Sequence, residues 1–449
     1  MRLKLKSLIL WVLGTLLTYY LIIIVLFLLQ GGSINKLMDV SDYLIKAVFD
    51  SPIFYILLIL PYLIFEFIKY LLRIRKKKGL TYMMKMLFLT LILPATLIFG
   101  AFRGIMWYNY QEDYQYVWDS SFENSTGQSS ELFEKDGKHR GIHVFFNRDE
   151  EKEIENLIRN NVEWVTLVPY AYQPDVLKPE LSFERSKRYS RSDSMFIESI
   201  KIVRKNNLKV LMKPHIWVSG DLWRSEISMD SEEDWQLWFE NYGEFILHYA
   251  KVAQETDCSA LCVGTELMKP ALQRPDDWRK LIRKVREVYD GELIYAANWD
   301  REYKEIEFWD ELDYIGVQAY FGLARQSLPT VEEICNGWKS HKKELLGIHR
   351  KWNKPILFTE VGYKSTMGAA HKPWEWESRL GSLSNRVSME TQANCYEALF
   401  RTFWNEPWFV GVHLWRWEGD HKLDFTPKNK PAANIMAKWF GRENQRIDD

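Results

Sequence analysis

Two glutamates follow short apolar runs in the C-terminal half of the chain. Glu266 lies in 260–267 (ALCVGTEL) and Glu360 in 355–363 (PILFTEVGY). An unpaired carboxylate is costly to bury among apolar residues, so a pair of acids in this setting indicates a shared role. If both runs are strands of one barrel, the two carboxylates face each other across its mouth. One facing carboxyl group can protonate a leaving oxygen while the other attacks an anomeric carbon, which is retaining glycoside hydrolysis.

Other polar and aromatic residues gather at the ends of apolar runs. These are Lys213, His215 and Trp217 at the end of 208–217, Asn298 and Trp299 in 292–299, Gln318 and Tyr320 in 312–320, and His413, Trp415 and Trp417 in 409–417. Aromatic faces of this kind stack on the apolar faces of sugar rings, and like-charge proximity would raise the pKa of one of the two glutamates. The alternative is that each glutamate only pairs with a buried Lys or Arg of the barrel.

The elements that position these residues alternate in type along the chain. Eight short β-rich runs are predicted as strands, at 141–146, 163–170, 208–217, 260–267, 292–299, 312–320, 355–363 and 409–417. Helical patterns lie between and after them, at 149–160, 192–206, 232–256, 275–289, 330–352, 388–405 and 430–440. Eight alternations over roughly 300 residues predict a (β/α)₈ barrel at 141–449. An open doubly wound sheet is the alternative, weakened because no glycine-rich phosphate turn follows the first strand.

Several of these strings resemble glycoside hydrolase family 113, a clan A family of endo-β-1,4-mannanases, over roughly 140–440. They are VGTEL, YAANWD, YIGVQAYF, LFTEVGYKS and HLWRWEG. The resemblance implies that Glu266 is the general acid/base and Glu360 the nucleophile. It further implies that Tyr320 hydrogen-bonds the nucleophile, that Trp415 or Trp417 forms the floor of a sugar subsite, and that Lys213, His215 and Asn298 bind substrate hydroxyls. Thr265 departs from the wider clan, in which Asn often precedes the acid/base, and this leaves the sugar preference open.

The first 106 residues have a different composition from the rest. They hold 13 basic and four acidic side chains, whereas residues 107–449 hold 46 basic and 56 acidic ones. Residues 8–29 carry no charge over a length that spans a bilayer, and further apolar runs at about 52–72 and 86–102 predict two more spans. We therefore expect three transmembrane α-helices, a linker at 107–140 and the barrel after it.

Basic residues set the expected orientation of the membrane region. Arg2, Lys4 and Lys6 precede the first expected span, and the run 73–78 (RIRKKK) lies between the second and third. Positive residues stay on the cytoplasmic side, so the barrel is expected outside, anchored in a lipid bilayer such as the bacterial cytoplasmic membrane.

The acidic, tryptophan-rich body argues against a nucleic-acid partner, because phosphate binding needs clustered Lys and Arg. Neither a cofactor nor a metal is expected, since no metal-binding motif such as HExxH occurs. The remaining hypotheses are a membrane-anchored retaining hydrolase of β-linked, mannan-like polysaccharide and a catalytically silent carbohydrate-binding or sensing barrel. A transport or assembly subunit, in which the helices do the work, is a third possibility.

Overall fold

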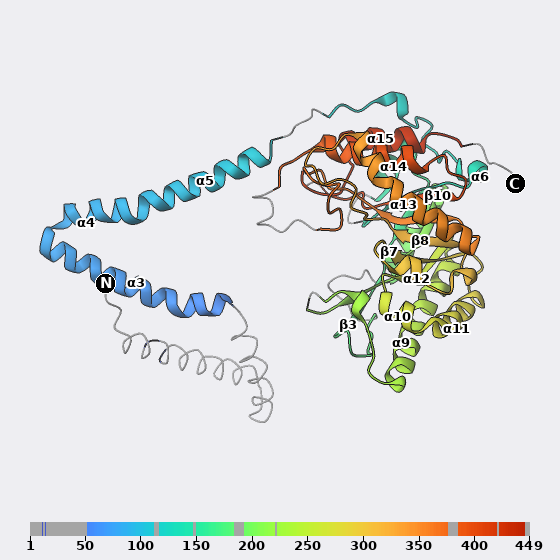
Figure 1. The fold of residues 1–449 in the computed structure, drawn as a ribbon, viewed down its shortest axis with the longest axis horizontal. Helices are drawn as coiled ribbons and strands as arrows, with labels where there is room; N and C mark the ends of the chain where they lie inside the picture. The colour runs from blue at the N-terminus through green and yellow to red at the C-terminus, as the bar shows by residue number, and fades with distance from the viewer. Residues whose placement is uncertain are drawn as a thin grey trace. The chain divides into compact units, whose positions relative to one another are not determined.

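The computed structural model describes residues 11, 14, 52–111, 116–146, 150–183, 193–220, 222–375, 385–419 and 422–444 (Figure 1). The chain divides into two compact units, Met1–Gly104 and Ile105–Asp449. Each unit is described by itself below.

The N-terminal unit is helical where it is described. Helix α3 covers Pro52–Lys78 and ends in the basic residues Arg75–Lys78. Helix α4 (Leu80–Leu87), a π-helical segment (Phe88–Ile92) and α5 (Leu93–Asn109) then run on as one helix. Hydroxyl groups within it are satisfied by its own backbone, because Thr90 and Thr96 donate to carbonyls four residues earlier, at 2.7 and 2.8 Å.

Within the described residues one helix, Leu80–Asn109, is long and apolar enough to cross a membrane, not the three that were expected. It contains the predicted span 86–102. The predicted span 52–72 lies inside α3, which also carries Glu66, Lys69 and the basic run. The predicted span 8–29 and the basic residues before it lie outside the described residues, apart from Trp11 and Gly14.

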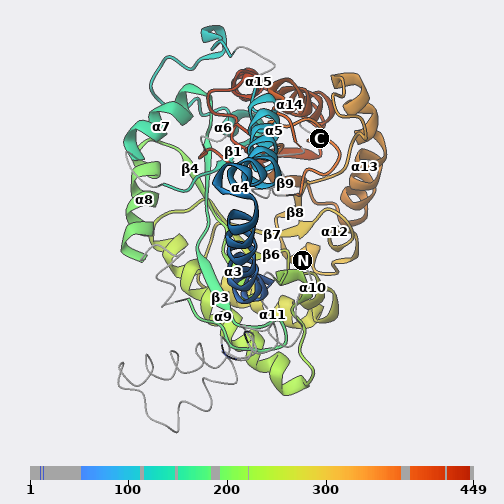
Figure 2. The ribbon, with the colours of Figure 1, turned by 90° about the vertical axis from the view of Figure 1, so that its left-hand side faces the viewer.

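The second unit contains a closed barrel of eight parallel strands. In spatial order the strands are β1 (His139–His143), β10 (Phe409–Leu414), β9 (Ile356–Val361), β8 (Tyr314–Gln318), β7 (Glu292–Asn298), β6 (Ala260–Thr265), β4 (Lys209–Met212) and β2 (Trp164–Leu167). The closed order excludes the doubly wound alternative. The strands lie inside a ring of helices (Figure 2).

A helix follows each barrel strand; seven of these helices match the sequence pattern, whereas the short α12 (Glu302–Glu305) was not expected. These are α7 (Glu150–Arg159), α8 (Asp193–Lys205), α9 (Glu232–Glu255), α11 (Pro275–Arg286), α12 (Glu302–Glu305), α13 (Val331–Trp352), α14 (Met389–Phe403) and α15 (Pro431–Phe440). Short helical segments complete the unit: η2 (Ser120–Phe122), α6 (Phe133–Asp136), η3 (Arg224–Glu226), α10 (Met268–Gln273) and η4 (Trp309–Glu311). Thr330 begins α13 with a capping box, in which it and Glu333 exchange hydrogen bonds.

Two predicted strands are each divided by a proline. The run 163–170 forms β2 and then β3 (Tyr170–Gln173), and the run 208–217 forms β4 and then β5 (His215–Val218). Pro169 and Pro214 stand at the breaks, where the missing N–H removes a ladder hydrogen bond. Strands β3 and β5 pair only with each other in the described sheets, as a two-stranded extension above the barrel strands. Strand β1 begins at His139, inside the range expected to be linker.

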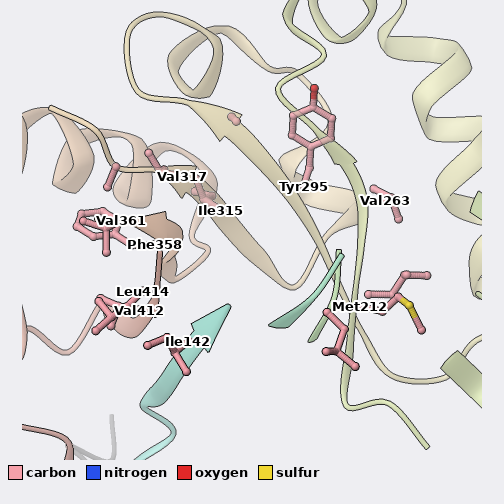
Figure 3. Packing of buried hydrophobic residues seen from close by; sticks show 14 of the residues in the cluster. Ile142, Met212, Val263, Tyr295, Ile315, Val317, Phe358, Val361, Val412 and Leu414 are labelled. Carbon is pink, nitrogen blue, oxygen red and sulfur yellow. The ribbon is translucent and has the colours of Figure 1, made fainter. Parts of the chain in front are cut away.

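Alternation along the strands separates two apolar layers. Leu211 and Ile294 belong to a cluster inside the barrel, whereas their neighbours Met212 and Tyr295 belong to the larger cluster between strands and helices. Figure 3 shows members of the outer cluster projecting from adjacent strands. The barrel interior is therefore a packed core and not an open channel.

Register shifts interrupt this alternation beside both candidate glutamates. One shift lies in β6 between Cys262 and Gly264, and another lies where Gln318 of β8 pairs with Glu360 of β9. A bulge of this kind re-aims the side chains that follow it. The bulge brings Glu360 opposite Gln318 at the C-terminal mouth of the barrel.

Candidate active site

Glu360 lies in β9, the seventh barrel strand in sequence order, and three donors surround its carboxylate. Tyr320 donates its hydroxyl to Oε1 at 2.5 Å. Lys213 donates to Oε2 at 2.7 Å and Gln318 donates to the same oxygen at 3.2 Å. Burial and the Glu360 carboxylate raise the pKa of Tyr320 well above its usual value, so the phenol stays protonated and remains a donor.

Glu266 follows β6, the fourth barrel strand, in a left-handed backbone conformation with φ of 54°. Gln318 donates to its Oε1 at 3.1 Å and the Trp223 indole donates to its Oε2 at 3.3 Å. Arg224 forms a salt bridge with the same Oε2. Both Trp223 and Arg224 come from the loop that follows β5.

Gln318 connects the two glutamates. Its Nε2 donates to Glu266 Oε1 and to Glu360 Oε2, while its Oε1 accepts from Lys213 Nζ at 2.8 Å. The Lys213 contact fixes the amide so that its NH₂ group faces both carboxylates. Since both oxygens hydrogen-bond one nitrogen, they lie no farther apart than the sum of 3.1 and 3.2 Å.

Lys213 is fully buried below the two carboxylates, and His143 is its neighbour on β1. Burial and the Lys213 charge lower the pKa of His143 well below its usual value, so the ring is neutral. Its Nδ1 donates to the Leu414 carbonyl at 3.1 Å, which leaves Nε2 to accept from Lys213 at 3.3 Å. The Lys213 ammonium group therefore donates to both His143 and Glu360.

A cavity of about 730 Å³ opens above the pair and exposes both glutamates. Half of its lining residues are Phe, Tyr or Trp, and two arginines also contribute; the lining includes Phe145, Tyr170, Trp217, Trp223, Arg224, Trp299, Tyr320, Trp374, Trp415, Arg416 and Phe425. Trp299 stacks on Trp374 with ring centroids 5.5 Å apart, and Trp217 is 49% exposed. Large aromatic faces beside a carboxylate pair suit the binding of sugar rings.

Most of the predicted site residues meet at this cavity. Glu266, Glu360, Tyr320, His215, Trp217, Trp299 and Trp415 line it, and Lys213 lies directly beneath. The Nε2 atom of His215 is buried and has no hydrogen-bond partner in the described structure. Burial lowers the pKa of His215 well below its usual value, which keeps the ring neutral.

Asn298 and Trp417 are not part of the cavity lining. Asn298 is fully buried and its side-chain amide donates to Glu302 at 3.1 Å. Trp417 donates to Glu153 at 2.6 Å and is 2% exposed. Strand β10 ends at Leu414, so the alternation that predicted an inward Trp417 does not extend to that residue.

Among the described residues no group of His, Cys, Asp and Glu side chains is arranged to hold a metal ion. His413 instead contacts His139 at 3.1 Å and Thr166 at 2.6 Å inside the barrel.

The sequence interpretation placed Gln318 at a strand end without giving it a role, and it missed Trp223 and Arg224, which contact Glu266 from the rim. Gln318 could have been found from its place in the strand that carries Tyr320. The loop residues carry no periodic signal, because only the folded loop brings them above Glu266.

Comparisons with known proteins agree with this geometry. The model of Glycoside Hydrolase Family 113 matches residues 138–438. A solved GH113 β-mannanase from Alicyclobacillus acidocaldarius is 27% identical, with a TM-score of 0.59, over 68% of this chain and 97% of that one. Another GH113 β-1,4-mannanase structure is 26% identical, with the same TM-score, over 68% of this chain and 98% of that one. No curated protein sequence matches.

The family match covers well over half of the chain, including every barrel strand from β1 to β10 and both candidate glutamates. The chain is a glycoside hydrolase and belongs to glycoside hydrolase family 113.

Proposed function

We propose that the protein is a retaining β-glycosidase that cleaves a mannan-like β-linked polysaccharide or oligosaccharide through Glu360 and Glu266. The observation that carries this proposal is the shared Gln318 nitrogen. It limits the separation of one oxygen of each glutamate to the sum of 3.1 and 3.2 Å. Retaining enzymes hold their carboxyl groups about 5–5.5 Å apart, whereas inverting enzymes need about 6.5–9.5 Å to admit a water.

The surroundings of each carboxylate favour one assignment of roles. Glu360 receives a cation and two neutral donors, which orient its carboxylate toward the cavity as a nucleophile needs. Glu266 sits beside the rim loop, where a leaving group has access. In the first step Glu266 gives its proton to the leaving oxygen while Glu360 bonds to the anomeric carbon. In the second step water bonds to the anomeric carbon, the bond from that carbon to Glu360 breaks, and Glu266 takes the proton of the water. Arg224 stabilises the Glu266 carboxylate before that transfer.

The mannan preference rests on the family and on the solved relatives, which are described as β-1,4-mannanases. A panel of soluble β-1,4-mannan, glucomannan, xylan and cellulose oligosaccharides tests it with the full-length chain in detergent. We expect product from the mannan series, with the β-anomer appearing first by proton NMR. First appearance of the α-anomer would refute retention.

Glu360→Ala is the control for the mechanism, because it removes the nucleophile. Its activity should fall to background. Residual activity equal to that of the unmodified enzyme would overturn the assignment, and tight glycan binding without any product would favour the silent binding barrel.

We also propose that the N-terminal region anchors the enzyme in a membrane, with the barrel outside the cytoplasm. The helix Leu80–Asn109 supports this, since it is long enough to cross a bilayer and exposes apolar side chains such as Leu97, Ile98 and Phe99. The basic end of α3 supports the orientation. Protease added to intact spheroplasts should release an active barrel; protection in spheroplasts but digestion in inverted vesicles would reverse the orientation.

A further inference from the structure

The turn that carries Glu266 has an unusual backbone. Glu266 adopts a φ of 54°, a left-handed conformation that costs energy for any residue with a Cβ. Such a conformation persists only where the surroundings hold it. Two hydrogen bonds do so here: Glu266 N–H donates to the Ala296 carbonyl at 2.9 Å, and Leu267 N–H donates to the Tyr295 hydroxyl at 3.1 Å.

Tyr295 reaches this turn from the neighbouring strand β7. Its ring lies against Gly264, where an added Cβ would approach the ring to 2.5 Å. Its hydroxyl accepts from Leu267 and donates to Glu302 Oε1 at 2.5 Å. The tyrosine therefore transmits the position of Glu302 to the backbone directly after Glu266.

Glu302 begins α12 and is fully buried. Its second oxygen accepts from the Asn298 backbone N–H at 2.8 Å and from the Asn298 side chain at 3.1 Å. Trp299, the next residue, lines the cavity. One buried carboxyl group thus holds the end of β6, with Glu266, and the end of β7, with Trp299.

Burial removes water from the Glu302 carboxyl group, which destabilises its charged form and raises its pKa to about 8. An apolar side chain would fill the same space without that cost. A buried acid next to an active site is a candidate for a functional role.

We propose that Glu302, acting through Tyr295, is a positioning residue that holds Glu266 in line with the leaving oxygen of the substrate. The inference rests on the proposed function, in which Glu266 protonates that oxygen while the glycosidic bond breaks and Glu360 bonds to the anomeric carbon. Misplacing the acid should therefore harm only substrates whose leaving group needs a proton.

The test compares two substrates of the full-length chain: a β-manno-oligosaccharide, whose leaving group is a sugar alcohol, and the matching 2,4-dinitrophenyl β-glycoside, whose leaving group departs without protonation. The variants are Glu302→Gln, which replaces an acceptor oxygen by a donor, and Tyr295→Phe, which removes one hydroxyl. We expect kcat/KM to fall about 100-fold on the oligosaccharide, the scale of loss for a misplacement of about 1 Å, and to change less than about 3-fold on the dinitrophenyl glycoside. The value of kcat/KM reports steps up to the bonding of Glu360 to the sugar. Slow hydrolysis of that intermediate therefore does not hide the difference between the two substrates.

Matched controls separate positioning from general loss of structure. Glu397 is also a buried glutamate and accepts from Trp439 and Arg401 at 2.8 Å each, and Tyr289 is a buried tyrosine that donates to the Cys258 carbonyl at 2.8 Å. Glu397→Gln and Tyr289→Phe should show no dependence on the leaving group.

Equal losses on both substrates would overturn the positioning role while leaving the proposed function intact. Hydrolysis of neither substrate by the unmodified enzyme would instead refute the proposed function and, with it, this inference. If Glu302→Gln does not fold, the losses of kcat/KM that Tyr295→Phe shows on the two substrates test the positioning role.

Discussion

Lys213→Met removes the cation beneath the active site while keeping most of the volume of the side chain. Lys213 is 0% exposed and contacts Glu360 at 2.7 Å and Gln318 at 2.8 Å. The substitution leaves the Glu360 carboxylate buried opposite an apolar group. We expect a large loss of stability as well as of activity.

The size of the loss follows from the geometry. Opposite unit charges 2.7 Å apart attract by about 6 kcal/mol at an effective dielectric constant of about 20. Part of this attraction offsets the desolvation of both groups, and breaking a buried pair from one side typically costs about 3–5 kcal/mol. The free energy of unfolding should therefore fall by about 3–5 kcal/mol in Lys213→Met.

A double-mutant cycle measures the interaction energy between Lys213 and Glu360. Glu360→Gln alone leaves the buried Lys213 without a carboxylate partner. Lys213→Met combined with Glu360→Gln leaves no unpaired buried charge. We expect the double variant to be more stable than the sum of the single losses predicts, by about 3 kcal/mol.

Urea unfolding of the full-length chain in detergent, followed by tryptophan fluorescence, measures each corner of the cycle. Strictly additive losses would refute the reasoning, because they would mean that the buried charges are not coupled. A Lys213→Met variant as stable as the unmodified enzyme would do the same.

Three further predictions concern other parts of the barrel. Burial raises the pKa of Glu418 to about 7 from 4.5, so the folded chain keeps a proton that the unfolded chain loses, and stability falls as pH rises through this window. Glu418→Gln should remove up to about 3 kcal/mol of that pH dependence in urea unfolding between pH 4 and pH 8, and an unchanged dependence would contradict it. Gly264→Ala places a Cβ 2.5 Å from the Tyr295 ring and 2.6 Å from Trp278, so thermal unfolding should show a loss of about 1–3 kcal/mol, with reduced oligosaccharide hydrolysis because the Glu266 turn shifts. Trp217→Ala removes a half-exposed face of the cavity and should raise KM for long oligosaccharides while leaving the unfolding temperature nearly unchanged; an unaltered KM would place the substrate elsewhere.

Much of the barrel could be predicted from the sequence because its signals are local. The helix patterns at 232–256 and 330–352 correspond to α9 and α13 within one residue at each end. Apolar periodicity arises from residues that are close together in the sequence, so it can be recognised without knowing the fold. The divided strands at Pro169 and Pro214 were missed, although the missing N–H of proline is itself a sequence signal.

The site residues that lie at strand ends could be predicted from the sequence. Glu266, Glu360, Tyr320 and Trp415 follow from strand ends, and the structure places all four at one cavity. Asn298 did not follow this pattern, because the buried Glu302 binds its amide.

The alternation of eight strands with helices could be read from the sequence, and so could the two glutamates on which the proposed hydrolysis depends. The connection between those glutamates appears only in the folded chain, because the bulges in β6 and β9 set the register that brings Gln318 between them. It also decided that Arg224 contacts Glu266 and that Tyr295 and Glu302 hold the turn behind it. Periodicity records which face of an element is buried, whereas these contacts depend on pairing between segments far apart in the chain.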